Sequence, residues 1–321
     1  MRRSIAREFA ALPGLAVNLV MTLDARFPPE PGPWRVVPVG PSDGLEKVAR
    51  VARECDCSVL IAPETNGILV ELTRKVEAAG ARTLGSSVEA VELTGDKSRT
   101  SALWEQRGIP TPTAIRWKPT ALWPEGMAVP AVFKPIDGAG SLDTFYLACR
   151  NPLPANLGAI REGLLQPFVP GVPMSASLLV TDGGEIWTLA TGRQRIKIQR
   201  GRFRYLGGEL PVACGPAESV VHRAVGAIPG LRGFVGVDFI WDPRRRRVTL
   251  LEINPRPTTS CMALGRLLPP GSLASAWLAA CGDPRGSPWL GSRLAEWIAS
   301  AAPIRFDPRD DLVARSGGLG S

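Results

Sequence analysis

The most specific signal in the sequence is a pair of apolar runs, Val237-Asp238-Phe239-Ile240 and Leu251-Glu252-Ile253-Asn254-Pro255-Arg256. Turn residues between the two runs predict a β-hairpin. Side chains two apart on a strand share a face, so Glu252 and Asn254 point the same way, and the hairpin partner brings Asp238 alongside them. Two carboxylates and an amide carbonyl form an oxygen cluster that suits Mg²⁺. The alternative is an ordinary solvated hairpin face.

A second run ends a strand with a lysine and follows it with small residues: Phe133-Lys134-Pro135-Ile136-Asp137-Gly138-Ala139-Gly140-Ser141. Backbone N–H groups of such a loop can wrap a phosphate, and the compact ammonium of lysine suits phosphate oxygens. The run has neither the GxxxxGK[ST] nor the GxGxxG spacing, which excludes a P-loop and a dinucleotide fingerprint. Taken alone, it is equally well explained as a glycine-rich turn.

Two further segments are informative only in combination with these runs and with their order along the chain. Thr94-Gly95-Asp96-Lys97 opens a predicted helix, from whose first turn Lys97 either reaches a phosphate or lies on the surface. Leu165-Gln166-Pro167-Phe168-Val169-Pro170-Gly171 ends a strand in a proline-locked extended segment. Its backbone N–H and C=O groups can pair with an adenine edge, or the segment is an interdomain linker.

Element patterns divide the chain into two textures. The first third alternates helices and strands, which predicts a parallel sheet covered by helices; helices are expected at 3–12, 43–54 and 65–79, and strands at 15–22, 34–39 and 58–62. Ser86 or Ser87 and, further on, Thr94 are candidate helix N-caps; Glu89 has capping-box spacing from Ser86, and a helix is expected at 95–107. The rest predicts strands at 131–136, 144–149 and 164–169, hairpins over 175–191, 195–206 and 234–254, and helices at 216–227 and 273–281.

Composition excludes several classes of protein. The chain has 321 residues, a net charge of +8, six cysteines and one histidine, His222. No apolar run approaches the ~18–20 residues of a membrane span. The cysteines form no zinc or disulfide pattern, so a metal would need oxygen ligands. The basic run Arg244–Arg247 lies in a hairpin turn without interleaved aromatic residues, which favours a solvated turn over nucleic-acid binding. We expect a cytoplasmic protein.

Together these segments, over residues 94 to 260, resemble the ATP-grasp superfamily of carboxylate–amine ligases, with the DF…EINPR ending as the most specific motif. The resemblance implies an α/β plus α+β architecture in three parts: an N-terminal parallel α/β subdomain (1–93), a small central lid subdomain (94–165) and a C-terminal antiparallel-sheet subdomain (166–321) that carries the Mg²⁺ site. Such relatives open with a strand and a glycine-rich loop before the first helix. This chain begins almost at that helix, so a truncated or replaced N-terminal subdomain is expected.

The same resemblance assigns roles to individual residues. It implies ATP and two Mg²⁺ ions as cofactors, with Mn²⁺ as a substitute. Phosphates would meet Lys97, Lys134, Gly138, Gly140 and Ser141; adenine would meet Gln166, Pro167, Phe168 and Val169; the metal would meet Asp238, Glu252 and Asn254; the acyl phosphate or the substrate carboxylate would meet Arg256. Lys134 and Arg256 would be the catalytic groups, because this chemistry consists of positioning and charge neutralisation without a histidine base.

A narrower resemblance is to the tyramine–L-glutamate ligase branch. It is carried by Ala62-Pro63-Glu64-Thr65-Asn66-Gly67-Ile68-Leu69, Leu84-Gly85-Ser86-Ser87, Gly192-Arg193-Gln194-Arg195 and Tyr205-Leu206-Gly207-Gly208-Glu209. This branch implies that Arg193 and Gln194, on a strand facing the ATP site, bind the α-carboxylate of L-glutamate. A solvated hairpin face is the alternative for the arginine.

The function expected from this resemblance is ATP-dependent amide formation through an acyl phosphate, joining L-glutamate to tyramine or tyrosine. The alternatives are another amino-acid or peptide ligase, a non-catalytic ATP-binding module, and a kinase that stops at the acyl phosphate. The expected partners are a small-molecule acid and amine, with no nucleic acid and no membrane. Homo-oligomer formation stays open.

Overall fold

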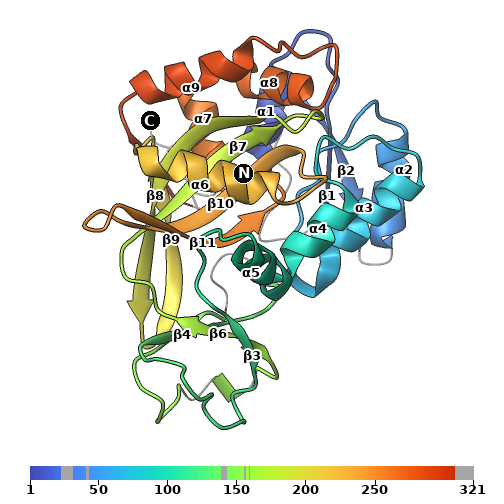
Figure 1. The fold of residues 1–321 in the computed structure, drawn as a ribbon. Coiled ribbons are helices and arrows are strands. Elements are labelled where there is room, and N and C mark those ends of the chain that lie inside the picture. The colour runs from blue at the N-terminus through green and yellow to red at the C-terminus, as the bar shows by residue number, and fades with distance from the viewer. Residues whose placement is uncertain (23–31, 41–42, 139–142, 155–156, 159, 308–321) are drawn as a thin grey trace, which may run out of the picture.

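The computed structural model describes residues 1–22, 32–40, 43–138, 143–154, 157–158 and 160–307. Within them, the chain forms a two-stranded parallel sheet and a ten-stranded sheet whose pairings are antiparallel, with helices packed around both (Figure 1). This arrangement confirms the expected mixture of a small parallel α/β part and a larger antiparallel part. None of the helices in these residues is long and apolar enough to cross a membrane.

The N-terminal part follows the expected alternation of helices and strands with one exception. Its elements are α1 (Arg2–Ala10), β1 (Asn18–Thr22), β2 (Arg35–Val39), α2 (Gly44–Arg53), the 3₁₀ turn η1 (Thr65–Gly67) and α3 (Ile68–Ala78). The strand expected at 58–62 is wrong, because only Ser58 bridges to a neighbour, Thr83. Leu60 and Ala62 instead pack on the small core between α2 and α3, so apolar burial occurs there without a ladder partner.

Two consecutive helices, α4 (Val88–Gly95) and α5 (Lys97–Gln106), are separated by a single residue. Ser87 caps α4 by accepting the Ala90 N–H at 3.3 Å. Of the two expected candidates, Ser87 is therefore the cap, whereas the Ser86 hydroxyl bonds to the backbone of Arg232. Asp96 caps α5 by accepting two backbone N–H groups, at 2.8 and 3.1 Å. Asp96 therefore separates the two helices, and Lys97 is the first residue of α5.

The large sheet has the strand order β11-β10-β7-β8-β9-β5-β4-β6-β3, with β12 paired to β9. Its strands are β3 (Ile115–Trp117), β4 (Ala131–Lys134), β5 (Phe145–Leu147), β6 (Gly163–Pro167), β7 (Val172–Val180), β8 (Ile186–Gln199), β9 (Arg202–Leu210), β10 (Gly233–Asp242), β11 (Arg247–Asn254) and β12 (Ile304–Phe306). All three expected hairpins form. Two of them share β8, which runs unbroken over 14 residues.

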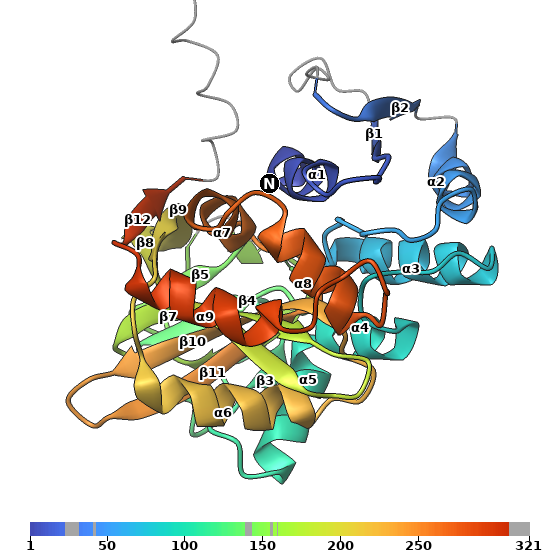
Figure 2. The ribbon, with the colours of Figure 1, turned by 90° about the horizontal axis from the view of Figure 1, so that it is seen from above.

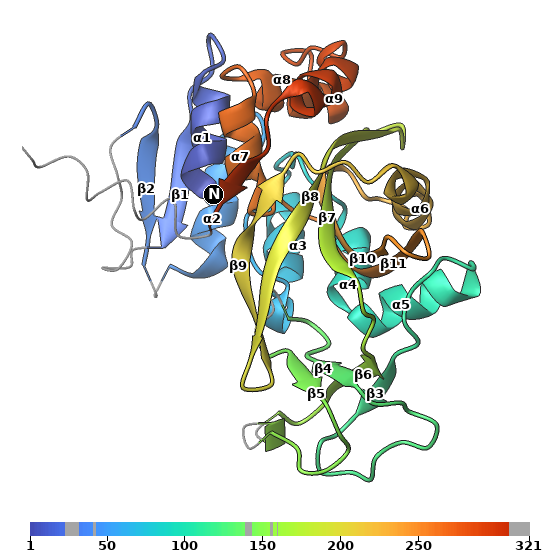
Figure 3. The ribbon, with the colours of Figure 1, turned by 90° about the vertical axis from the view of Figure 1, so that its left-hand side faces the viewer.

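The sheet consists of two parts that meet at one point. Strands β3 to β6 form a small lid around their own apolar cluster, centred on Phe133 and Phe145. Within the sheet, the lid pairs with the larger part at one ladder position, Phe145 with Arg202, at the far end of the β8–β9 hairpin (Figure 3), and backbone hydrogen bonds from Tyr146 to Gly201 and from Phe203 to Thr144 flank this pair. The Arg202 guanidinium lies 4.8 Å from the centre of the Phe145 ring, which strengthens this narrow joint.

Helices cover both faces of the larger part: α6 (Gly215–Gly226) lies on one side, and α7 (Ser260–Leu267), α8 (Ser272–Ala280) and α9 (Leu290–Ser300) lie on the other (Figure 2). Alternation along β10 sends Val237 and Phe239 into the core under α6 and Phe234 into the core under α8. Asp238 has the same parity as Phe234. It therefore points toward the α7–α9 face, where the lid and the N-terminal part approach the sheet.

Candidate functional site

The β10–β11 hairpin brings the two predicted carboxylates together. Asp238 and Glu252 are direct partners in the ladder, and a β-bulge follows Asp238 on the way to Phe239. The side-chain nitrogen of Asn254 lies 3.4 Å from an Asp238 oxygen, which leaves the Asn254 carbonyl oxygen free to face a cation. The three oxygen-bearing side chains predicted from the sequence thus form one cluster.

The two carboxyl groups have opposite electrostatic situations. Burial, and then the adjacent Glu252 charge, raise the pKa of Asp238 well above its usual range. Burial also acts to raise the pKa of Glu252, but the charges of Lys97 and Lys134 outweigh it and lower that pKa. The surroundings therefore favour one negative charge, on Glu252, and disfavour a second on Asp238, and an added cation would offset that penalty.

Two lysines from different elements converge on this cluster. The Lys97 ammonium, at the start of α5, lies 3.4 Å from a Glu252 oxygen and also donates to the carbonyl of Gly138. Lys134, the last residue of β4, donates to the Leu251 carbonyl at 3.3 Å. Burial lowers the pKa of Lys134 to about 8, although the Glu252 charge opposes this shift. Both lysines are more than nine-tenths buried, so neither is an ordinary surface lysine.

The glycine loop after β4 is fixed at three points. The carbonyl of Ile136 accepts the Lys97 N–H at 3.1 Å, and the carbonyl of Gly138 accepts the Lys97 ammonium. The Asp137 carboxylate accepts the backbone N–H of Asn66, in the N-terminal part, at 2.7 Å. Gly140 and Ser141, the other predicted phosphate contacts of this loop, lie outside the described residues.

The predicted adenine segment consists of the last two residues of β6 and the start of its link to β7. Gln166 is buried and pairs with Val132 in the lid ladder. Pro167 has no N–H, and Phe168 donates its own to the Pro130 carbonyl at 2.9 Å. Within the fully described stretch 166–169, this leaves the N–H of Val169 as the backbone donor without a bond to another residue. The segment thus offers one donor rather than a run of free groups.

The structure separates the two residues expected to bind a substrate carboxylate. Gln194 lies on the Asp238 side of the sheet and donates from its amide nitrogen to an Asp238 oxygen at 2.8 Å. Arg193 is one residue earlier on β8 and pairs with Met174, whose parity along β7 places it on the opposite face. Its side chain is exposed there. The expectation that Arg193 faces the ATP site together with Gln194 is therefore wrong, because strand alternation sends neighbours to opposite faces.

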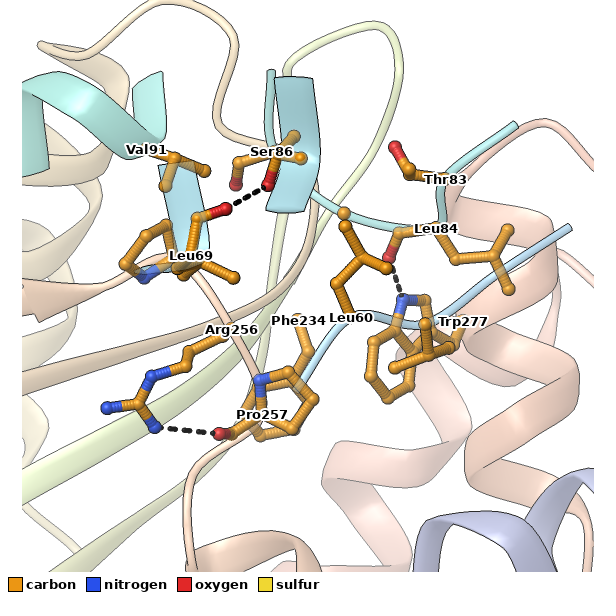
Figure 4. Close-up of a pocket in the computed structure, with 14 residues that line it drawn as sticks. Leu60, Leu69, Thr83, Leu84, Ser86, Val91, Phe234, Arg256, Pro257 and Trp277 are labelled. Atoms are coloured by element: carbon orange, nitrogen blue, oxygen red, sulfur yellow. Dashed lines mark hydrogen bonds between the residues drawn. The ribbon is translucent and has the colours of Figure 1, made fainter. Parts of the chain in front are cut away.

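Arg256 lies at the edge of the cluster, held by a residue that we did not predict as part of the site. Its Nε and Nη2 atoms each donate to a Glu64 carboxylate oxygen at 2.8 Å. Its Nη1 donates to the Pro257 carbonyl at 3.2 Å (Figure 4). In the sequence, Glu64 is part of the run 62–69 that carries the narrower resemblance, but no role was predicted for it. The signal that could have identified it is a carboxylate within the turn sequence Pro63-Glu64-Thr65-Asn66.

A small cavity lies beside Arg256. It has a volume of about 20 Å³ and is bordered by α3, the chain from Thr83 to Ser86, and the α8 residue Trp277 (Figure 4). That volume accommodates about one water molecule, so the cavity is too small for a nucleotide. The charged side chains gather instead at the junction of the lid, α5 and the β10–β11 hairpin.

The donor set fits a hard divalent cation. Two adjacent carboxylates and an amide oxygen are the ligand types that Mg²⁺ accepts, with further positions left for phosphate oxygens. Among the described residues, no group of three or more histidine, cysteine, aspartate or glutamate side chains is arranged to hold a metal. An oxygen cluster completed by Asn254 is consistent with both observations.

Comparison with known proteins agrees with this arrangement. Residues 94–260, more than half of the chain, match the family model of the ATP-grasp domain, and residues 17–91 match the pre ATP-grasp 3 domain. The chain belongs to the ATP-grasp family. Lys97, Lys134, Asp238, Glu252, Asn254 and Arg256 all fall within the matched ATP-grasp region.

Two relatives of this ATP-grasp chain are curated ligases. It is 33% identical over 212 residues to tyramine–L-glutamate ligase of Methanocaldococcus fervens, a match that covers 65% of this chain and 61% of the relative. It is 29% identical over 205 residues to D-alanine–D-alanine ligase of Chromohalobacter salexigens, covering 57% of this chain and 62% of the relative. The match thus spans about three-fifths of the length of each relative.

A solved structure extends the likeness to the fold. An ATP-grasp superfamily protein from Archaeoglobus fulgidus superposes with a TM-score of 0.57 and 26% identity, over 77% of this chain and 71% of that one. The ATP-grasp architecture of the chain is therefore supported by sequence and by shape.

Proposed function

We propose that this ATP-grasp chain is an ADP-forming ligase that joins a carboxylic acid to an amine through an acyl phosphate. The observation that carries the proposal is the convergence of Lys97 and Lys134 on the paired carboxylates Asp238 and Glu252. Two buried lysines beside the charged Glu252 and the carboxyl group of Asp238 form a cluster that can receive a triphosphate together with its metal ions. A fold built for stability alone gains little from such a cluster, because burying charges is costly.

Different residues would bind the metal, the phosphates and the adenine. Asp238, Glu252 and Asn254 would hold Mg²⁺, which supplies neutralising charge for the phosphate oxygens. Lys97 and Lys134 would bind phosphate oxygens from two directions, and the N–H of Val169 would donate to the adenine edge. The glycine loop, tied down through Ile136, Asp137 and Gly138, would cover the phosphates and exclude water.

The proposed chemistry has two steps. A carboxylate oxygen of the acid takes the terminal phosphoryl group of ATP and releases ADP, because an unmodified carboxylate has no leaving group. The amine nitrogen then attacks the acyl carbon, phosphate leaves, and the amine gives up a proton. Arg256 would neutralise the charge of the acyl phosphate or of the reacting carboxylate. No histidine is needed, and the single histidine, His222, lies on α6, where it bonds to Thr188.

L-Glutamate is the proposed acid and tyramine or tyrosine the proposed amine. The name of the Methanocaldococcus fervens relative supports these substrates. We further propose a cytoplasmic enzyme with the subdomain division 1–93, 94–165 and 166–321.

A screen of ADP release tests the proposal. Amino acids are crossed with aryl amines and with amino-acid acceptors in the presence of ATP and Mg²⁺, and products are identified by mass. We expect ADP release that requires both an acid and an amine, with glutamate plus tyramine or tyrosine as the most active pair. ADP release with the acid alone would indicate a kinase that stops at the acyl phosphate, and no release with any pair would contradict the ligase.

A second candidate is a ligase that joins two amino acids. The 29% identity to D-alanine–D-alanine ligase favours it. The same screen separates this candidate from a glutamate–tyramine ligase, because it predicts activity with several amino-acid acceptors and none with tyramine.

A further inference from the structure

The contact between Glu64 and Arg256 joins the N-terminal part of the chain to the reaction site. The two residues are 192 positions apart, and their side chains are 5% and 13% exposed. Both Glu64 oxygens are used, each at 2.8 Å from a different nitrogen of the same guanidinium. A bidentate pair of this kind fixes the plane and the direction of the arginine head group as well as its charge.

The remaining donors of Arg256 form a second fork. A guanidinium has five N–H donors. Glu64 takes the Nε donor and one Nη2 donor, and the Pro257 carbonyl takes one Nη1 donor. This leaves one N–H on each of the two terminal nitrogens, side by side in one plane. Such a fork matches the spacing of two oxygens of one carboxylate or phosphate.

The turn that carries Glu64 is itself held in place. The Gly67 N–H bonds to the Glu64 carbonyl at 3.0 Å, and the Leu69 N–H bonds to the Pro63 carbonyl at 3.1 Å. Asn66, two residues after Glu64, adopts a left-handed conformation with φ of 55° and donates its N–H to Asp137 of the glycine loop. One short turn therefore contacts both the phosphate-covering loop and the arginine at the reacting end of the site.

We infer that Glu64 is a positioning residue, which holds Arg256 so that its remaining two-donor fork faces the reacting carboxyl group and the phosphate bound to it. This inference rests on the proposed ligase function. It adds a residue from outside the matched ATP-grasp region to the machinery of the reaction. It also gives a reason why a buried carboxylate occupies two of the five guanidinium donors: the Glu64 carboxylate sets the direction of the Arg256 guanidinium.

The variant Glu64→Gln tests this role, because it keeps the size of the side chain and removes one of its two acceptors. We expect kcat for acid- and amine-dependent ADP release to fall by at least about 10-fold, while KM for ATP stays within about twofold. In the background of Arg256→Lys, which has no fork to orient, adding Glu64→Gln should reduce kcat no further. A purely structural role predicts additive losses and an altered KM for ATP. Thermal unfolding of each variant checks that it is folded, and Glu64→Asp, which retains a carboxylate, serves as a second variant with an expected smaller loss.

Glu71→Gln is the matched control. Glu71 lies on α3, seven residues after Glu64, has a side chain that is 47% exposed and pairs with Arg74 at 3.3 Å. Its removal should leave kcat unchanged. An active wild type whose Glu64→Gln variant keeps its full kcat, or binds the acid more tightly, would overturn the positioning role and leave the ligase standing. A wild type without acid- and amine-dependent ADP release would overturn the proposed function and this inference with it.

Discussion

Asp238 in the β10–β11 hairpin and Glu8 on α1 are both buried carboxyl groups with raised pKa values, yet their surroundings differ. Burial raises the pKa of Glu8 to about 7, against the opposing effect of backbone N–H groups at the start of α8, from Leu273, Gly271 and Ala274. Its Oε2 has no hydrogen-bond partner among the described residues. Asp238 faces a second carboxylate, with two lysines behind it.

This difference separates a site from a structural contact. A buried carboxyl group that faces backbone N–H donors can avoid the cost of burying a charge by taking up a proton, and this suffices for Glu8. The hairpin keeps Glu252 charged and sets it beside Asp238, so a proton on one group leaves charge on the other. The hairpin is therefore suited to a cation, and the α1–α8 contact is suited to a neutral acid.

The largest expected effect is on the hairpin. Glu252→Gln removes the carboxylate that both lysines hold in its charged form, so we expect turnover to fall by about 10³-fold or more. The amide has the same size, and the midpoint of thermal unfolding should change by only a few degrees. ADP release and a thermal scan on the same sample measure both quantities. Amide formation at the wild-type rate would refute the metal assignment.

Lys134→Met should weaken ATP binding by about 10- to 100-fold, because it removes a buried cation from the phosphate side of the cluster. Calorimetry with a non-hydrolysable ATP analogue and Mg²⁺ measures the dissociation constant. Lys118→Met is the control, since Lys118 is an exposed lysine of the same lid. Equal losses in the two variants would mean that the lid charge as a whole, and not the cluster, attracts the nucleotide.

A smaller effect distinguishes the two faces of β8. Gln194→Ala removes a hydrogen bond to the Asp238 carboxylate and should raise the Mg²⁺ concentration needed for half-maximal activity by about 10-fold. Arg193→Ala acts on the opposite face and should shift that concentration less. Titrating activity with Mg²⁺ for both variants measures the difference. A larger shift for Arg193→Ala would contradict the placement given by the strand alternation.

The smallest effect concerns Glu8 and is one of stability alone. Its folded-state pKa of about 7 lies above the ordinary value of 4.5, so the folded chain holds a proton that the unfolded chain has released in this window. Stability is therefore lost as the pH rises from about 4.5 to about 7, by up to about 3 kcal/mol. Glu8→Gln should abolish this loss and leave ADP release unchanged. Denaturant unfolding at pH 5 and near pH 8 tests it; parallel pH profiles for the two proteins would contradict the neutral Glu8.

Sequence periodicity predicted the hairpins well, because alternation and turn residues are local signals. Asp238, Glu252 and Asn254 lie together because a ladder leaves little freedom once its register is fixed. Their metal-binding roles, like the phosphate roles of Lys97 and Lys134, remain predictions. Arg193 was placed wrongly because its role was taken from the run Gly192-Arg193-Gln194-Arg195 alone. Strand alternation applied to that run would have predicted that Arg193 and Gln194 face opposite sides of the sheet.

Contacts between distant segments could not be predicted in this way. The strand expected at 58–62 had the right apolar residues, but strand formation also depends on a neighbour with a free edge, and only Thr83 provides one. Glu64 meets Arg256 across 192 positions, a contact set by how the N-terminal part docks on the sheet. Helices α7 and α9 were not predicted either, because their apolar faces match a core formed by several strands at once.

The single pair between Phe145 and Arg202 has a mechanical consequence. Strands β3 to β6 form their ladders mainly among themselves, so few backbone bonds resist a tilt of the lid. The side chains of Arg116, which donates to Asp96 at 2.8 Å, and of Lys134, which donates to the Leu251 carbonyl at 3.3 Å, hold the lid to α5 and β11. Lys134 lies at the end of β4, and Lys97, at the start of α5, is bonded to the loop that follows β4. A nucleotide bound by both lysines would then add a contact between the lid and α5, and this contact would be lost when the nucleotide dissociates.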